Sequence, residues 1–458
     1  MKYYTIGELC SITKGKTGIM KAIPGSYPLV TTSFERKTSN SYDFDDDAVC
    51  IPLVSSTGHG HKSLNYIHYQ SGKFALGTIL AAIIPKDKSV LLAEYLQRYL
   101  YFFKDQLVVP LMRGAANVSL AIRDIAKIKV PVPSIEKQKE YIKLFNKAEI
   151  GKIELLYETT NQSTYLSKLR QAILQEAIEA KLTAGWRKEQ ERNLAKDAET
   201  AKISLSELRA LREKDPNYNA LALLENIQTE KEKLIKEKKI RKAKPLAPIK
   251  AEEIPFELPK NWVWTRLGEI ADVGTGATPL TTNDAYYKNG GFNWVTSSST
   301  GMPFVENPDK LITNKALAET NCKVYPVHTL IIAMYGQGKT RGQISELLIP
   351  AATNQAVAAI QLCNKNDNHR RFIKIFFQNH YHEIRKLASG GAQPNLNLQK
   401  IITTKIPLPP LAEQQAIVSR VEKLLAMVYE LEQQVTARKD QSEQLMQSVL
   451  KEAFSGGN

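Results

Sequence analysis

The sequence predicts a mixed α/β protein made of two copies of one unit, each a globular domain followed by a long helix. Three observations support this prediction. The sequences at the start and at the end of the globular part each occur twice along the chain, and the second of them is followed both times by the apolar spacing of a coiled coil. Elsewhere, short apolar runs alternate with helical patterns. We therefore expect an α+β fold. Two globular α/β domains would lie in a pseudo-two-fold arrangement, separated by two long antiparallel coiled-coil helices.

The repeat is anchored at both ends of the unit. Residues 128–138 (IKVPVPSIEKQ) match 404–415 (TKIPLPPLAEQQ) at an offset of 276, and residues 6–15 match 267–276 at an offset of 261. Between these two ends the offset between the copies changes, and the two sequences differ. The sequence therefore predicts two related domains whose interiors have diverged.

Each Pro-x-Pro stretch precedes the pattern of a coiled-coil helix. From Ile417 to Val435, apolar residues recur at alternating spacings of four and three, which is typical of a narrow seam that packs on a partner helix. The matching stripe of the first copy runs from Phe145 to Ala177. Each helix would have about 44 residues, roughly 66 Å at 1.5 Å per residue. Because each seam needs a partner, we expect the two helices to pair; the alternative is two independent surface helices on one large core.

These patterns divide the chain into four regions. We expect a globular domain at 1–133, a central helical region at 134–253, a second globular domain at 254–409 and a C-terminal helix at 410–458. The central region would hold a long helix at 134–182, a helical insert at 187–244 and a linker at 245–253. Residues 231–244 carry eight basic and two acidic residues, and form either a solvated helix end or a contact for phosphate or an acidic partner.

Within the globular domains, residue type predicts individual elements. Apolar β-rich runs at 48–54, 329–334 and 356–362 favour strands, and the patterns at 93–103 and 369–386 favour helices. Polar stretches rich in Gly, Ser, Thr, Asn and Gln separate them.

Composition limits the class of function. The 458 residues include 62 Lys and Arg against 47 Asp and Glu, a formal net charge of +15, which favours a polyanionic partner. The longest apolar run is far shorter than the roughly 20 residues that cross a bilayer, and the start has no apolar signal core. The four cysteines form no CxxC pair, which is typical of a protein from a reducing compartment. We expect a cytoplasmic protein with no membrane partner.

One stretch is similar to a nucleotide-binding loop. Residues 333–340 (AMYGQGKT) fit a relaxed Walker A pattern with Ala in place of the first Gly. A phosphate loop must open a helix whose N-terminus faces the phosphates, and the following RGQIS is a poor first helical turn. A P-loop-like NTPase using residues 336–340 is nevertheless the enzymatic alternative.

Other catalytic signals are missing from the sequence. His59, His61 and His68 have no Cys or carboxylate at ligand spacing. No nucleophile elbow, amino-methyltransferase tetrapeptide or nuclease motif is present. We therefore expect a non-catalytic chain with no metal site and no cofactor of its own.

Polar loops at matching places in the two copies are suited to reading DNA. Residues 55–62 (SSTGHGHK) correspond to 335–341 (YGQGKTR), and 113–117 (RGAAN) are similar to 389–395 (SGGAQPN). Glycine lets the backbone approach a ligand, while hydroxyl, amide and basic side chains donate to phosphates or base edges. The alternative for any one of them is an ordinary surface loop. The candidate DNA-binding residues are Thr31, Thr32, Ser33, Ser55, Ser56, Thr57, Gly58, His59, Gly60, His61, Lys62, Arg113, Asn117, Thr278, Thr296, Ser297, Ser298, Tyr335, Gly336, Gln337, Gly338, Lys339, Thr340, Arg341, Asn354, Gln355, Gln393 and Asn395.

Further stretches complete a pattern that covers the chain. They are residues 406–415 (IPLPPLAEQQ) with their weaker copy at 130–138, 182–187 (LTAGWR), 231–242 (KEKLIKEKKIRK) and 254–270 (IPFELPKNWVWTRLGEI). Together they resemble the specificity subunits of type I restriction-modification systems. One departure is that no lead-in like residues 254–264 precedes the first domain.

The resemblance implies function and partners. Each globular part would be a target recognition domain that reads one half of a split DNA sequence, and the helices would set the gap and carry two methyltransferase subunits. Motor-nuclease (restriction) subunits would join for cleavage. The cofactors would belong to the partners: S-adenosylmethionine in the adenine-modifying methyltransferase, ATP and Mg in the motor-nuclease subunit. Because the two variable parts differ, the half-sites should differ and the target should not be palindromic. The second alternative is a coiled-coil scaffold without DNA contact.

Overall fold

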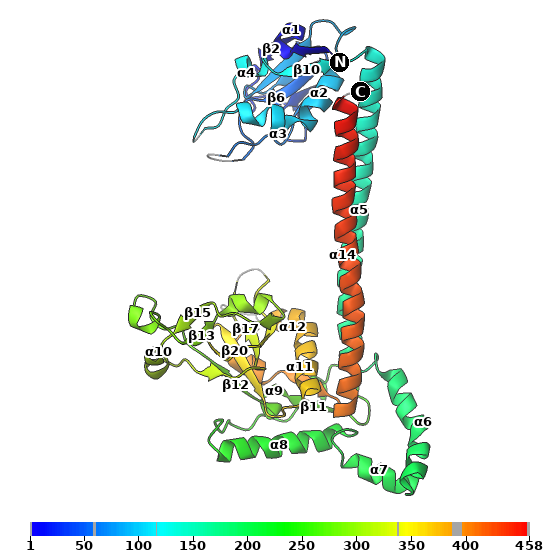
Figure 1. Cartoon of the computed structure of the whole chain (residues 1–458), viewed down its shortest axis with the longest axis vertical. Coiled ribbons are helices and arrows are strands. Elements are labelled where there is room, and N and C mark those ends of the chain that lie inside the picture. Colours follow the sequence, from blue (N-terminus) through cyan, green and yellow to red (C-terminus); the bar gives the residue numbers. More distant parts are fainter. Residues whose placement is uncertain (1, 58–60, 116, 337–338, 387–395, 456–458) are drawn as a thin grey trace. The chain divides into compact units, whose positions relative to one another are not determined.

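The chain folds into two compact units of mixed helix and sheet. The computed structural model describes residues 2–57, 61–115, 117–336, 339–386 and 396–455, the last three by their backbone alone. Unit 1 comprises Met1–Gln162 with Gln434–Asn458, and unit 2 comprises Ser163–Gln433 (Figure 1). Helices make up 46% and strands 20% of the chain, which confirms the predicted mixed fold class.

The two ends of each globular domain pair with one another. In unit 1, β1 (Lys2–Thr5) is antiparallel to β10 (Lys129–Val132); in unit 2, β11 (Val263–Arg266) is antiparallel to β21 (Lys405–Leu408). In both pairs the first residue of the first strand lies opposite the last residue of the second. The two registers are related by the sequence offsets of 261 and 276. The repeat seen in the sequence is therefore confirmed as a repeat of structure.

Unit 1 carries two four-stranded sheets, ordered β2-β9-β6-β7 and β4-β3-β8-β5. Its strands are β2 (Cys10–Lys14), β3 (Tyr27–Val30), β4 (Lys37–Ser39), β5 (Phe44–Asp45), β6 (Ala48–Pro52), β7 (His68–Gln70), β8 (Lys73–Leu76) and β9 (Leu80–Pro85). Its shorter helices are α1 (Ile6–Leu9), α2 (Ala93–Phe102), α3 (Lys104–Leu107) and α4 (Ile122–Ile125).

Strand β6 shows why this domain has two layers of core. Val49 and Ile51 pack with α2, whereas Ala48 and Cys50 pack with the second sheet. Successive side chains of a strand point to opposite faces, so a strand covered on both faces is apolar throughout. The continuous apolar runs predicted as strands correspond to β6 and, in unit 2, to β17 and β20.

Unit 2 repeats this plan with additions. Its sheets are ordered β12-β20-β17-β18-β14 and β15-β13-β19-β16. The parallel pairing of β13 with β19 corresponds to that of β3 with β8. The strands are β12 (Ala271–Thr275), β13 (Phe292–Val295), β14 (Phe304–Val305), β15 (Lys310–Ile312), β16 (Val324–Tyr325), β17 (Leu330–Ala333), β18 (Ile344–Leu347), β19 (Ala351–Thr353) and β20 (Val357–Leu362).

The helices of the second domain are α9 (Leu267–Ile270), α10 (Asn314–Glu319), α11 (Asp367–Asn379), α12 (Tyr381–Lys386) and α13 (Leu398–Ile402). Helix α11 is buried through Phe372, Ile373 and Phe376. The prediction of a helix at 369–386 is correct in type but wrong in number, because two helices, α11 and α12, are separated at His380.

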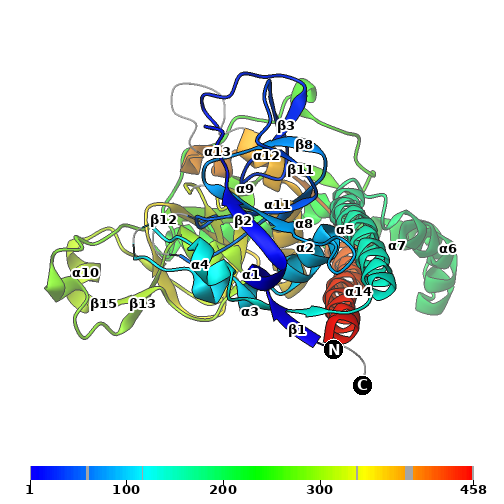
Figure 2. The same cartoon turned by 90° about the horizontal axis from the view of Figure 1, so that it is seen from above.

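Two long helices follow the domains: α5 (Ile135–Ile178) with 44 residues and α14 (Leu411–Ser455) with 45. In unit 1, Phe145 and Leu450 share one core and Arg438 lies 3.3 Å from Glu158. In unit 2, Arg170 lies 2.9 Å from Glu432. Residues nearer the end of α5 contact residues nearer the start of α14, so the two helices are antiparallel as predicted (Figures 1 and 2).

The insert between the copies forms α6 (Ala184–Ala201), α7 (Leu205–Glu213) and α8 (Ala220–Lys236). Helix α8 packs on the core of unit 2 through Leu223 and Ile227. It ends eight residues before the expected Lys244, and Lys238, just beyond its C-cap, has a left-handed φ of 58° that no helical turn can continue. Among the described residues, no helix combines the length and apolar character needed to span a bilayer.

Candidate nucleic-acid interface

The same hydroxyl turn follows the equivalent strand in both units. After β3, the Thr31 and Ser33 hydroxyls lie 2.8 Å apart and the Ser33 N–H donates to Thr31 Oγ1 at 3.3 Å. After β13, Thr296 and Ser298 repeat both contacts at 2.6 and 3.3 Å. We call these the hydroxyl turns. Each holds its central residue, Thr32 or Ser297, at the surface of the domain.

In unit 1, the hydroxyls of the 55–62 loop close the loop itself. Ser55 Oγ donates to the His61 carbonyl at 2.6 Å, and the Thr57 and Ser63 hydroxyls lie 2.8 Å apart. Ser56 Oγ accepts from the Asn65 N–H at 2.9 Å. These three residues therefore shape the loop, while the side chains of His61 and Lys62 are exposed. Gly58, His59 and Gly60 lie outside the described residues.

The structure brings the second predicted loop of unit 1 against the first. Ser55 N–H donates to the Val118 carbonyl at 3.0 Å, and Arg113 and Ser119 exchange two backbone hydrogen bonds of 2.8 Å. The Arg113 side chain is 73% exposed and lies 3.8 Å from Asp124. Asn117 is also exposed. Two segments separated by more than 50 residues thus form one polar surface.

In unit 2, the predicted residues converge around the turn between β19 and β20. Thr278 Oγ1 donates to Gln355 Oε1 at 2.6 Å, and the Asn354 N–H donates to the Val295 carbonyl at 3.1 Å, next to the hydroxyl turn. The Met334 N–H donates to the Ala356 carbonyl at 2.7 Å, which places the start of the 335–341 loop beside them.

This convergence requires glycine at one point in each unit. A Cβ on Gly276 would lie 1.7 Å from the Thr353 carbonyl oxygen, and one on Gly15 would lie 2.3 Å from the Gly77 carbonyl oxygen. The two glycines are related by the offset of 261. Close approach of two backbones at the edge of the site is therefore a shared feature of both domains.

The described residues of the 335–341 loop, 335–336 and 339–341, connect two antiparallel strands. Strand β17 turns back into antiparallel β18, with Gly342 N–H donating to the Ala333 carbonyl at 2.8 Å. Helix α12 holds the loop from outside: the Tyr381 hydroxyl donates to the Lys339 carbonyl at 2.6 Å and Arg385 to the Arg341 carbonyl at 2.8 Å.

No helix opens in the described segment 339–347, so the N-terminal N–H groups that would cradle a nucleotide are missing there. The nucleotide-binding alternative therefore has no structural support in that segment. Gln337 and Gly338, and likewise Gln393 and Asn395, lie outside the described residues.

The sequence did not single out the aromatic residues next to these loops. Phe34, directly after the first hydroxyl turn, is 73% exposed, and its ring centroid lies 5.7 Å from that of Tyr66. Arg36 fastens this segment to β7. A single aromatic residue within the polar stretch TTSFERKTS was the available signal.

Three buried titratable groups of unit 1 are neutral at pH 7. Burial, and secondarily the charge of Arg36, lower the pKa of His68 to about 4. Burial raises the pKa of both Cys10 and Cys50 to about 12, so these thiols stay protonated at neutral pH. Among the described residues, His, Cys, Asp and Glu side chains form no group of three or more that could hold a metal ion.

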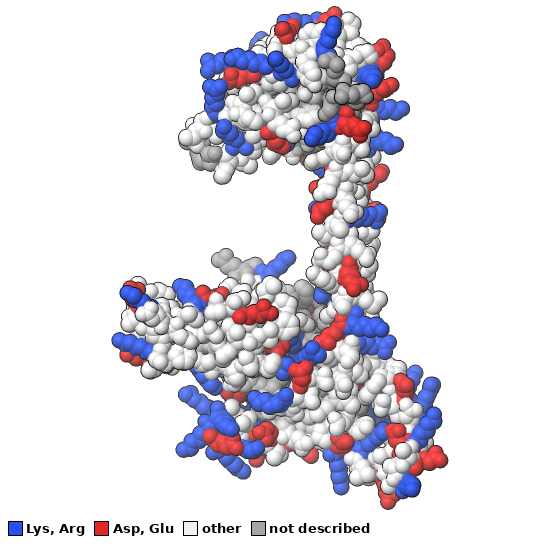
Figure 3. Space-filling model, in the orientation of Figure 1, with Lys and Arg blue, Asp and Glu red and all other residues white. Residues whose placement is uncertain are grey.

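Basic and acidic side chains are interspersed over both units. In the view of Figure 3, Lys and Arg alternate with Asp and Glu on the surface of the domains and along the helices. The net positive charge of the chain is therefore not gathered in one patch on this face.

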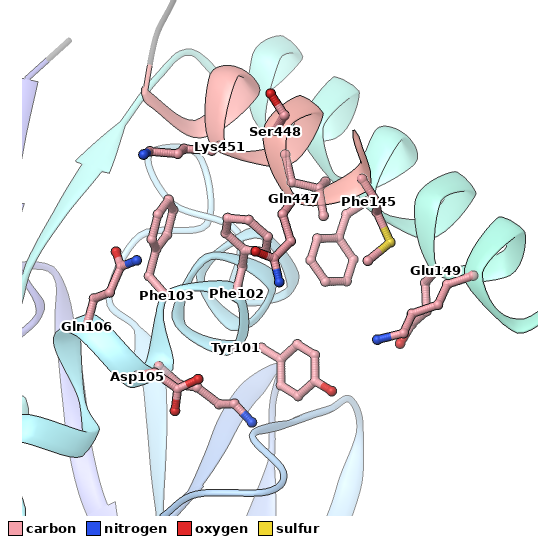
Figure 4. Close-up of a pocket in the computed structure, with 14 residues that line it drawn as sticks. Tyr101, Phe102, Phe103, Asp105, Gln106, Phe145, Glu149, Gln447, Ser448 and Lys451 are labelled. Atoms are coloured by element: carbon pink, nitrogen blue, oxygen red, sulfur yellow. The ribbon is translucent and has the colours of Figure 1, made fainter. Parts of the chain in front are cut away.

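Each unit also has a groove beside its domain, lined by both long helices in unit 1 and by α5 in unit 2. In unit 1 a groove of about 640 Å³ lies between the α2–α3 segment and the helices α5 and α14. Figure 4 shows that Tyr101, Phe102, Phe145 and Gln447 line it. In unit 2 a groove of about 870 Å³ is lined by Gln171 among others. Gln447 and Gln171 are related by the offset of 276, so the two grooves lie in comparable places within their units.

Two copies of one α/β domain, each with a hydroxyl turn, polar loops and a coiled-coil helix, define a duplicated recognition protein. The family model of the type I restriction modification DNA specificity domain matches residues 1–163 and 259–438. The chain belongs to this family. The resemblance carried by the sequence motifs is thereby confirmed.

Known relatives agree with this assignment. The specificity subunit of the type I restriction enzyme EcoDI of Escherichia coli is 24% identical over 462 residues, which cover 99% of this chain and 88% of that protein. The EcoAI subunit of Escherichia coli is 28% identical over 232 residues, 49% of this chain. That match covers only 38% of the EcoAI subunit's length.

Solved structures share the fold. The HsdS subunit from Thermoanaerobacter tengcongensis matches with a TM-score of 0.52 at 16% identity, over 99% of this chain and 96% of that one. A chain from a study of the assembly and conformational transition of the type I R-M system matches with a TM-score of 0.62 at 15% identity, over 99% and 97%.

Proposed function

We propose that this chain is the non-catalytic specificity subunit of a type I restriction-modification complex. Each globular domain is a target recognition domain that reads one half of a bipartite, non-palindromic DNA target. The two long helices set the gap between the half-sites and carry two methyltransferase subunits for adenine methylation. Motor-nuclease subunits join the same assembly for restriction.

The repetition of one scaffold under two different loop sequences carries the proposal. Both domains present a hydroxyl turn built on identical contacts, yet the adjoining loops read SSTGHGHK in one and YGQGKTR in the other. Polar groups that differ in donors and acceptors select different base edges in the major groove. The two half-sites should therefore differ in sequence.

The grooves beside the long helices support docking of partner subunits. In unit 1 the groove has aromatic walls, formed by Tyr101, Phe102, Phe103 and Phe145. Aromatic residues are enriched in protein interfaces because they bury a large area at low entropic cost. We expect S-adenosylmethionine in the methyltransferase partner, and ATP and Mg in the motor-nuclease partner.

Mapping of modified adenines tests the proposal. The gene is expressed with its methyltransferase partner, and modified bases are mapped across the genome in cells with and without it. We expect methylation at one split sequence with two unlike halves and a fixed gap. Methylation that is independent of this chain, or that follows a palindromic sequence, would contradict the proposal.

A second measurement tests the role of the helices. Binding of the subunit–methyltransferase complex is measured on target duplexes carrying one to four additional base pairs in the gap. Since stiff helices fix a distance, each insertion should weaken binding strongly. Equal affinity for all gap lengths would show that the helices set no distance.

A further inference from the structure

Phe34 projects from unit 1 beside the first hydroxyl turn. Its side chain is 73% exposed although it is a large apolar ring. The ring is not isolated, since its centroid lies 5.7 Å from that of Tyr66, and Tyr66 in turn stacks on His68 at 5.9 Å with an interplanar angle of 17°. These three rings, the ring row, become progressively more buried: Phe34 is exposed, Tyr66 is half-buried and His68 is 7% exposed.

Arg36 holds the backbone of this tip in place. Its Nη1 donates to the Phe34 carbonyl at 3.2 Å and lies 3.1 Å from His68 Nδ1. Its Nε donates to Gln70 Oε1 at 3.1 Å and its Nη2 to the Tyr69 carbonyl at 3.3 Å. One guanidinium thus ties the tip to strand β7 through four contacts. An exposed ring on a fixed backbone loses little conformational entropy when it packs against a ligand.

The chemistry around the tip favours bases over phosphates. Ser33 and Glu35 flank Phe34, and both side chains are exposed. A carboxylate at the tip repels a phosphate group, whereas it can accept a hydrogen bond from the amino group of cytosine. The hydroxyl of Ser33 donates to the Glu35 carbonyl at 3.1 Å, which keeps the turn compact.

The ring row also adjoins the loops that were predicted to contact DNA. Tyr66 follows Asn65, whose N–H donates to Ser56 Oγ at 2.9 Å. Lys104 Nζ donates to the Leu64 carbonyl at 2.7 Å. The ring row therefore connects the hydroxyl turn, next to Phe34, with the described residues of the 55–62 loop, next to Tyr66.

We propose that the Phe34 ring enters the duplex of one half-site and stacks on a base at an opened base step, with Tyr66 supporting it from behind. Apolar side chains that enter a base step unstack it and kink the duplex, and a backed ring is rigid enough to hold the step open. This proposal rests on the proposed function, because it names a contact within the recognition of DNA by unit 1.

The test compares ring and non-ring variants in the complex with methyltransferase subunits. The probe is the target duplex found by adenine mapping, with 2-aminopurine in place of an adenine in each half-site in turn. Binding of the unaltered complex should raise 2-aminopurine fluorescence in one half-site, because the opened step unstacks the base. Phe34→Ala should remove this rise and weaken binding about tenfold, the effect of losing one base–aromatic contact.

Matched variants make the result specific. Phe34→Trp should keep the affinity because it keeps a ring, whereas Phe34→Leu should weaken binding about as much as Phe34→Ala, because an aliphatic side chain has no ring face to stack on a base. Tyr42→Ala is the control: Tyr42 is 44% exposed and packs on Tyr27 at the opposite end of β3, so both signals should stay unchanged. Unchanged melting temperatures confirm folding of the variants.

The outcomes separate this proposal from the proposed function. Native affinity and native fluorescence in Phe34→Ala overturn the stacking contact while leaving DNA recognition intact. Equal affinity of Phe34→Leu and Phe34→Trp for the target also overturns it, because the contact would then need bulk and no ring. Absence of any DNA binding by the unaltered complex overturns the proposed function itself.

Discussion

His369 is buried at 0% exposure where α11 meets the start of α14, with Nδ1 3.1 Å from Gln414 Oε1. Burial lowers its pKa to about 4, and the hydrogen bond to Gln414 acts in the opposite direction but is weaker. Gln414 and its counterpart Gln138 are both fully buried, and Gln138 accepts from the Leu92 N–H at 2.9 Å. The paired glutamines of the repeat therefore join each long helix to its domain.

The lowered pKa of His369 predicts acid sensitivity of unit 2. Below pH 6.5 the His369 imidazole is protonated in the unfolded chain, whereas in the native state it is protonated only below about pH 4. The free energy of unfolding therefore falls as the pH drops through this range. The loss attributable to His369 between pH 7 and 5 should be about 2 kcal/mol. It is measured by urea unfolding followed by tryptophan fluorescence, since Trp186, Trp262, Trp264 and Trp294 all belong to unit 2.

The control for this measurement is a second histidine. His369→Asn should flatten the dependence of stability on pH, even if it lowers stability at pH 7. His382→Asn removes an exposed histidine of the same unit and should leave the dependence as it is. A variant at position 369 with the original pH dependence would contradict the assignment.

At the scale of residues, the sequence revealed which positions are special but not how each side chain is used. The hydroxyls of Ser55 and Thr57 were predicted to donate to DNA, yet they bond within their own loop. Serine and threonine satisfy nearby backbone groups whenever the loop conformation allows it, and that conformation depends on Val118 from a distant segment. Pattern alone therefore could not separate a DNA contact from a loop closure.

At the scale of elements, the first turn of α14 is anchored by one buried carboxylate. Glu413 is 0% exposed and accepts hydrogen bonds from Thr183 Oγ1 and Trp262 Nε1, each at 2.8 Å. It also pairs with Arg187. The start of α14, the start of α6 and the lead-in to the second domain thus meet at a single side chain within unit 2.

Replacement of Glu413 should therefore destabilise unit 2 strongly. Glu413→Ala leaves Arg187 and the Trp262 N–H without their buried partner, at an expected cost of about 3–5 kcal/mol. The matched control is Glu422→Ala on the same helix, whose carboxylate is half exposed and lies 3.5 Å from Arg371. That change should alter stability by about 0.5 kcal/mol or less. Tryptophan-detected urea unfolding of both variants gives the comparison, and equal losses would refute the anchoring role.

The long helices were the most predictable elements, and the ends of the insert were the least. The alternating four-three spacing from Ile417 predicted α14 because every seam residue needs the same partner surface. The end of α8 at Lys236 was not visible, since the left-handed Lys238 that ends it is set by local backbone geometry. Lysine residues on either side favour a helix equally well.

At the scale of the whole molecule, the net charge of +15 predicts that DNA binding depends on salt. Each phosphate neutralised by Lys or Arg contributes a slope of about −0.9 to the logarithm of affinity against that of salt concentration. Lys62→Ala and Arg113→Ala, which remove exposed basic side chains of unit 1, should each make the slope shallower by about one. Fluorescence anisotropy at several salt concentrations measures it, with Tyr42→Ala as the neutral control. Affinity that does not vary with salt would contradict a contribution from phosphate contacts.

The duplication was the global feature that the sequence revealed correctly, because its ends are constrained by structure. Residues 128–138 and 404–415 keep their similarity since both form a closing strand and a helix start, with a fully buried glutamine at each. The loops at 55–62 and 335–341 differ in sequence because neither includes a closing strand or the start of a long helix. Phe34 escaped notice for the same reason, as no counterpart in the second copy marks it.

The pairing of β1 with β10 and of β11 with β21 has a consequence for how such a protein can change over time. In each domain the first and last strands pair with one another, so residues inserted between these two strands leave the start of the long helix unchanged. The offset between the copies rises from 261 at the first strand to 276 at the last, so the second domain is 15 residues longer. Its first and last strands nevertheless pair in the same register as those of the first domain. A domain can therefore acquire new surface loops without a compensating change in the helices α5 and α14.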